Sequence, residues 1–394
     1  MIRTTSDLPD QAGLVIIGGG IVGAASAFFA ARAGLHPLIL ENRSALATLT
    51  TPASTGAFRL QFDNQAELEM IRESVDIFLN FAEFTDQKEY RAGIIQQGYL
   101  WVTTREARAE YQRELVARQH SWGQTDIELL DGDEVRSRFP YVSPAVIQGR
   151  FRAGDGFLDP KSVALGFAHG ADCPVVINTR ADKILVANDR VIGVETTRGV
   201  INTDLVLIAA GPFSGLMART AGIQLPLDAV NRSKVVMPRV PEVPTTAPMT
   251  IDDDTGTHWR PALEGAYLLF TDPAVPPSEP SWSPEPDHDY ALRILDPDSP
   301  QAAARISPFW SDVWRRSDAL WLVQAGQYSV TPDHRPLIGE TDVNGLFINS
   351  GYSGHGIMAG PAGSRHLIDT IVHPGRANPF ALDRHFEATT PGFL

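Results

Sequence analysis

Cysteine and lysine are scarce in the 394-residue sequence, which has one cysteine, Cys173, and only four lysines. A single cysteine cannot form an internal disulfide bond and cannot by itself hold an iron–sulfur cluster. Arginine and lysine together number 33, against 47 aspartate and glutamate residues, so the formal net charge is -14. An acidic surface is repelled by nucleic-acid phosphates and by anionic lipid. We therefore expect a cytoplasmic protein with no nucleic-acid or membrane partner.

The sequence also lacks a convincing membrane-spanning segment. Residues 12–31 carry no charge and are long enough to cross a bilayer. Four glycines divide this run into a short β-branched strand at 14–17 and a helix of small residues at 21–33. The first ten residues include Asp7 and Asp10, which argues against a signal peptide. We expect neither membrane insertion nor export.

Motifs for metal binding and for several kinds of catalysis are missing. The ten histidines show no HExxH or paired spacing, so we predict no metal site. No P-loop or nucleophile elbow is present either. The composition, 43% hydrophobic and 20% charged, is that of a folded protein.

A dinucleotide-binding motif opens the chain. The strand at 14–17 is followed by GGGIVG (18–23), which has the form G-x-G-x-x-G, and then by the predicted helix. The three motif glycines permit a tight turn, close approach of a pyrophosphate and close helix packing, and the helix N-terminus attracts phosphate. A second strand at 37–40 ends in Glu41, which is placed to bind a ribose hydroxyl. An acid there disfavours NADP, and the motif alone leaves FAD and NAD open.

The segments after Glu41 indicate how the cofactor domain is assembled. No adjacent third strand follows Glu41, and residues 50–62 read as a small, hydroxyl-rich loop. Strand-like segments reappear only at 191–195 and 204–211, the second ending at Ala-Gly. We therefore predict a cofactor domain built from distant parts of the chain. Helical periodicity is plain at 66–81 and 106–120, outside these segments.

Six blocks carry a resemblance to a known family. They are VIIGGGIVG (15–23) with Glu41, ASTGAFRLQF (53–62), GDGFLDP (154–160), LVLIAAGPFS (205–214), GQYSVTPDHRPLIG (326–339) and NSGYSGHGIMAGPAG (349–363). In family order and nearly end to end, they resemble the D-amino-acid oxidase superfamily of FAD-dependent oxidoreductases, in the branch of sarcosine oxidase, its beta-subunit relatives and dye-linked proline dehydrogenase.

The resemblance implies an α/β (α+β overall) fold with two interleaved domains. A Rossmann-like FAD-binding domain would comprise residues 1–90, 151–225 and 325–394. A mostly antiparallel β-sheet substrate domain would comprise residues 91–150 and 226–324.

The resemblance also implies an activity, the oxidation of a C–N bond of a secondary amine or N-alkylated amino acid, such as sarcosine or proline. A hydride would pass to flavin N5 and leave an imine. One alternative is an oxidase of a primary amino acid, glycine or a D-amino acid. Another is a non-catalytic flavin-binding subunit or assembly factor. Homo-oligomers and hetero-oligomers both fit, and the identity of the substrate stays open.

Residues that match the family's FAD contacts are carried over one by one. They are Gly18, Gly20, Ile21, Val22, Gly23, Glu41, Asn42, Arg43, Ser54, Thr55, Gly56, Ala57, Ala181, Ala210, Gly211, Gly326, Gly351, Tyr352, Ser353, Gly354, His355, Gly356, Ile357 and Met358. The helix expected at 357–371 would point its positive end at the flavin pyrimidine edge.

The substrate side of the predicted site rests on four residues. Arg59 matches an arginine that pairs the substrate carboxylate, and Tyr328 is expected to close the pocket. His355 lies in the flavin loop, where we expect it to orient backbone. Met358 stands where sarcosine oxidase has a carboxylate-binding lysine, and Gly354 stands where glycine oxidase has an arginine. Arg59 is then the only one of these carboxylate contacts left.

Further differences from the family pattern bear on the electron acceptor and on how the flavin is attached. Sarcosine-type oxidases keep a lysine over the flavin, whereas the matching strand here, 265–270, has none. Lys234 lies in a segment, 232–236, that reads as a strand rather than as that site. These differences favour a dehydrogenase, although O2 and another acceptor both stay open. Gly326 stands where monomeric sarcosine oxidase attaches FAD through cysteine, and ASTGAF lacks the linking histidine of dimethylglycine-type relatives, so we expect noncovalent FAD.

Two further segments are ambiguous. Eight prolines between 272 and 300 argue against strand or helix. We expect a solvated loop there, with a lid or partner surface as the alternative. His258 and Arg260 begin the strand that faces the substrate in relatives. We expect them to face outward, with contact between either one and the substrate as the alternative.

Overall fold

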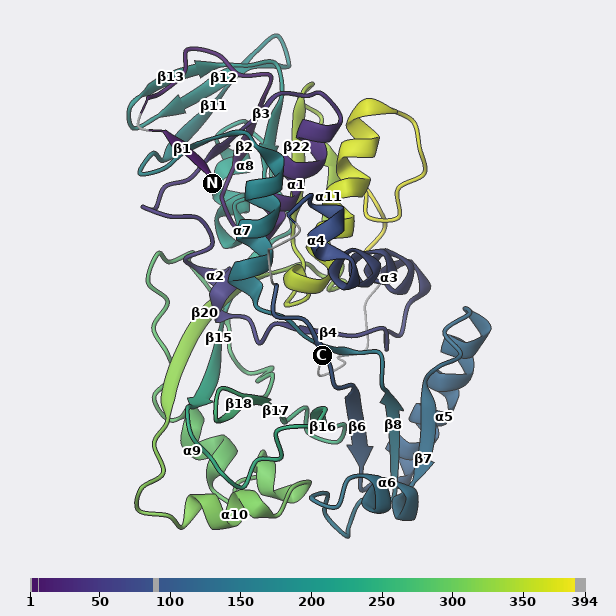
Figure 1. The fold of residues 1–394 in the computed structure, drawn as a ribbon. Helices are drawn as coiled ribbons and strands as arrows, with labels where there is room; N and C mark the ends of the chain where they lie inside the picture. The colour runs from purple at the N-terminus through teal and green to yellow at the C-terminus, as the bar shows by residue number, and fades with distance from the viewer. Residues whose placement is uncertain (1, 6, 88–91, 387–394) are drawn as a thin grey trace.

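The computed structural model describes residues 2–5, 7–87 and 92–386. Its first sheet has seven strands in the order β1-β10-β3-β2-β14-β22-β21, parallel except for β21 (Figure 1). The strands are β1 (Arg3–Thr5), β2 (Leu14–Ile17), β3 (Pro37–Leu40), β10 (Pro174–Val176), β14 (Val206–Ile208), β21 (Leu337–Glu340) and β22 (Leu346–Ser350). The sheet thus joins strands far apart in the sequence, as predicted for the cofactor domain.

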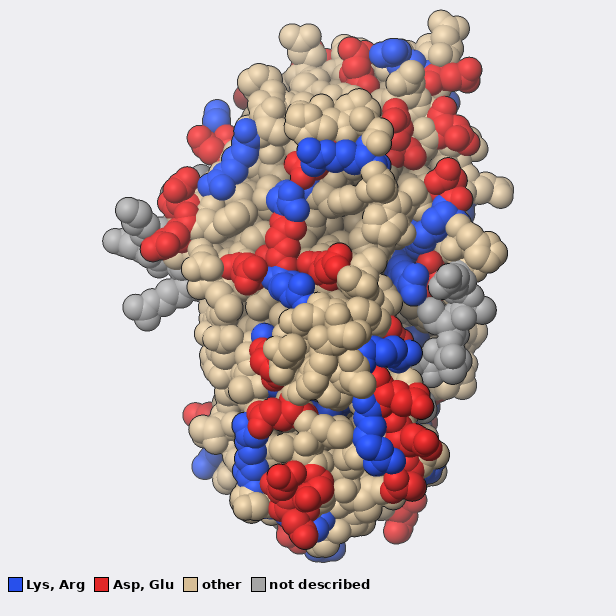
Figure 2. Space-filling model, turned by 90° about the vertical axis from the view of Figure 1, so that its right-hand side faces the viewer, with Lys and Arg blue, Asp and Glu red and all other residues tan. Residues whose placement is uncertain are grey.

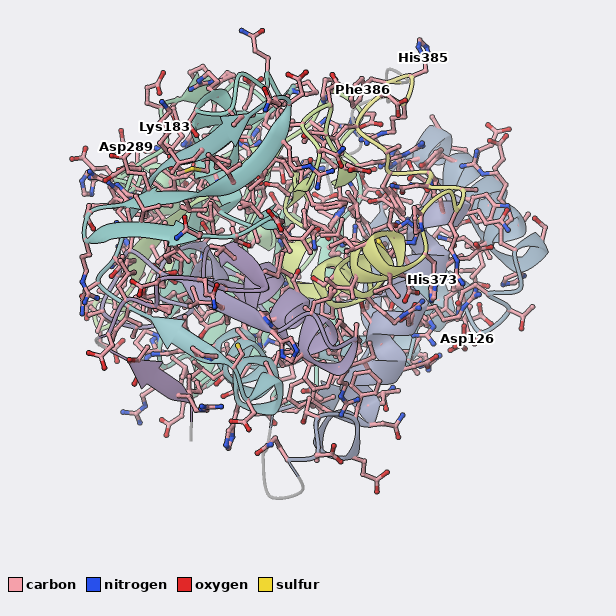
Figure 3. The ribbon with its side chains drawn as sticks, turned by 90° about the horizontal axis from the view of Figure 1, so that it is seen from above. Asp126, Lys183, Asp289, His373, His385 and Phe386 are labelled. Carbon is pink, nitrogen blue, oxygen red and sulfur yellow. The ribbon has the colours of Figure 1, made fainter. Side chains whose placement is uncertain are left out.

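The order of this sheet follows from its residues. The four residues of β2 are apolar and fully buried, as in a parallel strand covered on both faces. Helix α1 (Ile21–Arg32) packs on the sheet and contacts α7 (Pro160–Ala171) and α11 (Gly356–Val372). Only a glycine fits at Gly23, since a Cβ there would lie 1.9 Å from the Gly18 carbonyl oxygen. Seen from above, α11 runs alongside α1 and ends toward His373 (Figure 3).

A second sheet has nine strands and lies below the first in Figure 1. Neighbouring strands are antiparallel except for the parallel pair β6 and β16. Its strands are β6 (Tyr99–Thr103), β7 (Glu128–Asp131), β8 (Gln148–Arg152), β15 (Asp228–Met237), β16 (Met249–Asp252), β17 (His258–Ala262), β18 (Gly265–Leu269), β19 (Pro277–Ser278) and β20 (Leu322–Val330). The mixed fold class is confirmed, and the domain boundaries stay a prediction.

Two three-stranded sheets and the remaining helices complete the described part of the chain. One sheet comprises β11 (Ala181–Ala187), β12 (Arg190–Thr196) and β13 (Gly199–Asn202), and the other comprises β4 (Ala57–Phe58), β9 (Gly156–Phe157) and β5 (Ile95–Gln96). The helices are α2 (Thr50–Ala53), α3 (Gln65–Leu79), α4 (Phe81–Phe84), α5 (Glu106–Ser121), α6 (Gly132–Arg138), α8 (Ser214–Arg219), α9 (Tyr290–Leu295) and α10 (Phe309–Trp314), with 3-10 turns η1 (Gly211–Phe213) and η2 (Ala303–Arg305).

Most predicted elements are confirmed, and two segments need correction. The predicted helices at 66–81 and 106–120 appear as α3 with α4 and as α5. Residues 50–62 are not wholly a loop, because α2 and β4 form within them. The Pro-rich segment contains helix α9, which fits between Pro286 and Pro297, and the short strand β19.

The uncharged run at 12–31 divides into β2 and α1, as the glycines predicted. In the described part of the chain, no helix has the length and apolar character needed to cross a membrane. On the face drawn in Figure 2, acidic and basic side chains are interspersed.

Candidate active site

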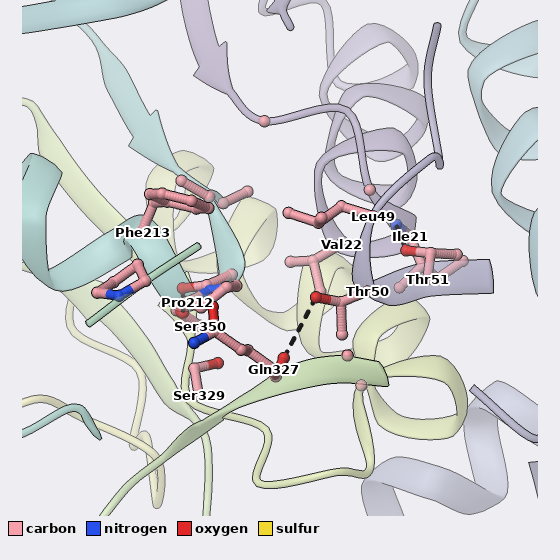
Figure 4. Close-up of a pocket in the computed structure, with 18 of the residues that line it drawn as sticks. Ile21, Val22, Leu49, Thr50, Thr51, Pro212, Phe213, Gln327, Ser329 and Ser350 are labelled. Atoms are coloured by element: carbon pink, nitrogen blue, oxygen red, sulfur yellow. Dashed lines mark hydrogen bonds between the residues drawn. The ribbon is translucent and has the colours of Figure 1, made fainter. Parts of the chain in front are cut away.

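A cavity of about 550 Å³ lies where the two large sheets meet. It follows the carboxyl ends of β2, β3, β14 and β22, and β15 and β20 of the nine-stranded sheet close it (Figure 4). Open parallel sheets bind their ligands at this edge. Figure 4 shows the hydrogen bond from the Thr50 hydroxyl to the Gln327 carbonyl oxygen, which is 3.2 Å long and joins α2 to β20.

The turn between β2 and α1 forms one end of the cavity. Gly18 has a φ of +111°, and a Cβ there would lie 2.5 Å from the Ala209 carbonyl oxygen. The Glu41 carboxylate accepts hydrogen bonds of 2.8 Å from the backbone N–H groups of Gly19 and Arg43. Burial raises the pKa of Glu41. Carboxylate oxygens that each accept one bond retain lone pairs for a ribose hydroxyl.

The first turn of α1 carries a contact that the sequence did not predict. The Thr51 hydroxyl oxygen accepts a 3.1 Å hydrogen bond from the Ile21 N–H. One N–H at this helix N-terminus is therefore satisfied by α2, and the positive end of the helix still faces the cavity at Gly20 and Val22.

At the other end, two glycines lie where an added side chain would collide with other residues of the cavity wall. Gly354 has a φ of +100°, and a Cβ there would lie 2.6 Å from Cε2 of Tyr328. A Cβ at Gly326 would lie 2.9 Å from Cβ of Ala53. Helix α11 begins beside them, and its first residues line the cavity. The backbone thus forms the cradle that a planar flavin ring requires, so the residues present fit FAD.

Two cations from the nine-stranded sheet hold the loop that precedes β4. Lys234 on β15 is 3% exposed, and its Nζ donates a 3.1 Å hydrogen bond to the Ser54 carbonyl oxygen. Arg260 on β17 donates from Nε to the Thr55 carbonyl oxygen at 2.8 Å. Burial, reinforced by Arg260, lowers the pKa of Lys234 to about 7.

These contacts confirm one sequence prediction and correct another. Lys234 lies on a strand, as predicted, and it also lines the cavity. His258 and Arg260 do not face outward, because His258 is buried and Arg260 reaches across to Thr55. Burial lowers the pKa of His258 to about 4.

Arg59 is buried in an aromatic box. It is 4% exposed, and its Cζ lies 4.6 Å from the ring centre of Phe62, 5.6 Å from that of Trp101 and 6.0 Å from that of Tyr99. Its Nε is buried without a hydrogen-bond partner. No carboxylate of the described residues forms an ion pair with Arg59. A buried cation without an anion is costly, so this position favours a carboxylate ligand.

His355 links Arg59 to a buried acid. Its Nε2 lies 3.3 Å from Nη2 of Arg59, and its Nδ1 lies 3.8 Å from Oε1 of Glu67. Because guanidinium only donates, Nε2 of His355 is the acceptor, and the neutral ring then carries its proton on Nδ1, toward Glu67. His355 therefore positions a side chain, Arg59, as well as its own loop.

The structure brings most of the predicted cofactor residues to one cavity. Seventeen of them line it: Gly18, Gly20, Ile21, Val22, Glu41, Asn42, Arg43, Ser54, Ala181, Ala210, Gly211, Gly326, Tyr352, Ser353, Gly354, Gly356 and Ile357. Those that do not line it are Gly23, Thr55, Gly56, Ala57, Gly351, His355 and Met358. Of the predicted substrate residues, Tyr328 lines the cavity, Arg59 and His355 lie together beside it, and Met358 is buried in the core around α11.

Several lining residues were missed by sequence reasoning. Arg232 and Lys234 both line the cavity from β15. Residues two apart on a strand share one face, so this pair of basic residues could have been predicted from the sequence to point the same way. Phe213 and Trp282 also line it, and their rings stack at 3.8 Å between centres. Nothing local in the sequence pairs residues so far apart.

Comparisons with known proteins agree with this geometry. A family model described as "FAD dependent oxidoreductase" matches residues 14–370. Human mitochondrial sarcosine dehydrogenase is 26% identical over 93% of the chain and 40% of its own length, and human mitochondrial dimethylglycine dehydrogenase is 26% identical over 92% and 43%. The chain thus spans less than half the length of these two curated relatives. D-amino acid dehydrogenase of Cereibacter sphaeroides is 25% identical over 92% of each chain.

Solved structures show the same fold. L-proline dehydrogenase from P.horikoshii superposes with a TM-score of 0.82 at 24% identity, covering 95% of this chain and 96% of that one. Glycine oxidase from Bacillus cereus superposes with a TM-score of 0.77 at 22% identity, covering 95% and 99%. With the family model matched over most of its length, the chain belongs to the DAO family of FAD-dependent oxidoreductases.

Proposed function

We propose that the protein oxidises the C–N bond of a secondary amine or N-alkylated amino acid and gives an imine. When bound, FAD supplies the hydride acceptor, N5 of its ring. The observation that carries the proposal is Arg59, a buried cation without an acid partner beside the flavin loop. Its planar guanidinium is suited to bidentate binding of a substrate carboxylate.

The cavity also favours the reactive form of an amine. An amine must lose its ammonium proton before it can give up a hydride. Burial lowers the pKa of the Lys234 amine to about 7, which shows how strongly this environment disfavours an ammonium ion. A substrate amine beside Lys234 would experience a similar desolvation and the same nearby cation, Arg260. The protein's part is then to orient the substrate and keep it neutral.

Relatives support the chemical class. Their names include dehydrogenases of sarcosine, dimethylglycine and D-amino acids, and a 4-methylaminobutanoate oxidase. These substrates are amines that carry a carboxylate, as Arg59 requires. Oxidation of a primary amino acid is the rival within the class, and a flavin-binding subunit without activity is the rival outside it.

Anaerobic reduction of the bound flavin tests the proposal. The FAD-loaded protein is mixed with sarcosine, proline, glycine and D-alanine, and each is paired with an analogue lacking the carboxylate, such as dimethylamine or pyrrolidine. Sarcosine or proline should bleach the flavin absorbance, and the analogues should do so far more slowly. Bleaching by glycine or D-alanine alone would favour the primary-amine rival. A flavin that no amine reduces, but that dithionite does, would favour the non-catalytic role.

The same cavity bears on whether the electron acceptor is O2 or another compound. Lys234 supplies a buried amine, so the absence of lysine on β18 does not by itself argue against O2. The lack of a lysine on β18 is therefore weaker support for a dehydrogenase than the sequence suggested. Re-oxidation of the reduced protein by O2 and by an artificial dye, measured side by side, would decide between the two acceptors.

A further inference from the structure

Residues 277–283, here called the strap, run along the edge of the cavity: most of them are exposed to solvent, and two of them line the cavity. They lie within the Pro-rich segment and start with β19, which pairs with β15 through Ser278 and Ala229. Pro280 and Trp282 line the same cavity as Glu41. The strap therefore forms part of the cavity wall at its dinucleotide end.

A buried glutamine on β20 fastens the first half of the strap. Gln327 is 2% exposed, and its Nε2 donates to the Ser278 hydroxyl at 3.1 Å and to the Glu279 carbonyl oxygen at 2.9 Å. Its Oε1 accepts a 2.7 Å hydrogen bond from the Ser281 N–H. One side chain thus satisfies three polar groups of the strap, which apart from β19 has no ladder of its own.

The second half is fastened at Trp282. Its ring stacks on Phe213, with centres 3.8 Å apart and planes 14° apart, and its carbonyl oxygen accepts a 2.9 Å hydrogen bond from Nη1 of Arg43. Phe213 belongs to η1, after β14, and Arg43 follows β3. The strap therefore bridges from the nine-stranded sheet to two loops that hold the opposite wall.

Apart from β19, the contacts that fasten the strap lie outside the strand pairing of the two large sheets. Trp282 as a residue is still 41% exposed, so the stack on Phe213 buries only part of it. Beyond the strap the chain is anchored again by the Asp287 N–H, which donates to the Ser233 hydroxyl at 3.2 Å. A segment tied at both ends by strand pairing and hydrogen bonds, and held in its middle by one stack and one side chain, can open as a unit.

We propose that the strap is a cofactor-retaining element: FAD enters and leaves the dinucleotide end of the cavity only when Trp282 leaves Phe213, so the strap sets how slowly FAD is released. In the closed form Pro280 and Trp282, which line the same cavity as Glu41, would help to hold the dinucleotide there. The inference concerns the binding of FAD and does not depend on which amine is oxidised.

The release rate of FAD tests this. The FAD-loaded protein is mixed with an excess of another apoflavoprotein that captures free FAD. The uptake of FAD by this scavenger is followed over time. Trp282→Ala should release FAD about tenfold faster or more, because the stack and the part of the cavity wall that Trp282 forms are both lost. Trp282→Phe should stay nearer to the wild type. Gln327→Ala, which removes the other fastening, should also accelerate release.

Leu292→Ala is the matched control. Leu292 is an exposed residue of α9 in the same Pro-rich segment and does not line the cavity, so its release rate should equal that of the wild type. Release from Trp282→Ala within twofold of the wild type would overturn the proposal, as would equal acceleration by Leu292→Ala. Circular dichroism checks the fold of each variant, and if Trp282→Ala does not fold, Gln327→Ala decides by the same criterion.

Discussion

Two buried basic residues, Arg59 and Lys234, are unusual features of this site at the residue scale. Arg59 has aromatic rings and His355 around it, and Lys234 has only the Ser54 carbonyl oxygen as a hydrogen-bond acceptor. Neither forms an ion pair with a carboxylate of the described residues. Proteins rarely bury charge in this way for stability, because desolvation outweighs what neutral partners return. Arg59 is therefore better explained by a ligand than by folding, whereas Lys234, with its pKa lowered to about 7, can lose its charge when buried.

Replacing Arg59 should separate binding from stability. Arg59→Ala should raise the KM for a carboxylate-bearing amine about 10- to 100-fold, the range expected for a lost charged hydrogen bond. Flavin content should not change. Steady-state kinetics and the absorbance ratio of flavin to protein measure the two. An amine without a carboxylate is the control, and its KM should change little. Equal loss for both amines, or unchanged kinetics, would remove Arg59 from the substrate site.

Lys234 should make stability depend on pH. Its pKa is about 7 in the folded protein and close to 10.5 when unfolded, so between these values the unfolded chain binds more protons. The free energy of unfolding should therefore rise with pH in this window, by up to about 1.4 kcal/mol per pH unit from this residue. Urea titrations of the wild type and of Lys234→Met at pH 7 and pH 8.5 measure the difference. Parallel pH dependence in the two proteins would contradict this role of Lys234.

At the scale of elements, the loop before α11 packs against β20, and this packing decides the shape of the cavity at the end where we expect the flavin ring. The loop before α11 holds Gly354 close to the ring of Tyr328, and His355 is the residue that precedes the first turn of the helix. Packing against α1 and α3 holds helix α11 in position. The cradle is thus a product of three elements whose sequences lie far apart.

Gly354→Ala should weaken FAD binding more than it weakens folding. The added Cβ meets Tyr328 at 2.6 Å, and φ is +100° there, so the loop or the Tyr328 ring, which lines the cavity, must shift. We expect the Kd for FAD to rise at least tenfold, measured by titration of the apoprotein. Gly375→Ala is the control, because Gly375 has a similar φ of +88° and nothing within 4 Å of the built Cβ. If both variants bind FAD equally well, the Tyr328 contact does not shape the site.

For the whole molecule, the cavity is a joint product of two sheets. The seven-stranded sheet supplies the dinucleotide turn and the flavin loop, and the nine-stranded sheet supplies Lys234, Tyr328 and the strap. Neither sheet alone encloses the cavity. Bound FAD therefore contacts both and should stabilise them together.

The bound FAD should be released completely when the whole fold is lost. The single cysteine, Cys173, does not line the cavity, and Gly326 has no side chain to form a link. Acid precipitation should leave a colourless pellet and place all of the flavin in the supernatant, measured by its absorbance. Flavin retained in the pellet after washing in denaturant would show a covalent bond and would contradict the expectation.

The sequence by itself determined the elements whose signals are local. The spacing of glycines fixed the turn between β2 and α1, because only a residue without a Cβ fits at Gly18 and Gly23. Apolar periodicity located α3 and α5, and the acid after β3 marked the dinucleotide site. These features depend on neighbours within one turn or one strand, so they can be read in order along the chain.

Only the tertiary structure decided what lies opposite those elements. Lys234 reads as one residue of a strand, and its role appears only when β15 crosses the cavity beside Ser54. The stack of Trp282 on Phe213 likewise joins a proline-rich segment to a turn after β14. The physical reason is that burial, desolvation and contact between distant segments are properties of the folded chain, and residue spacing does not encode them locally.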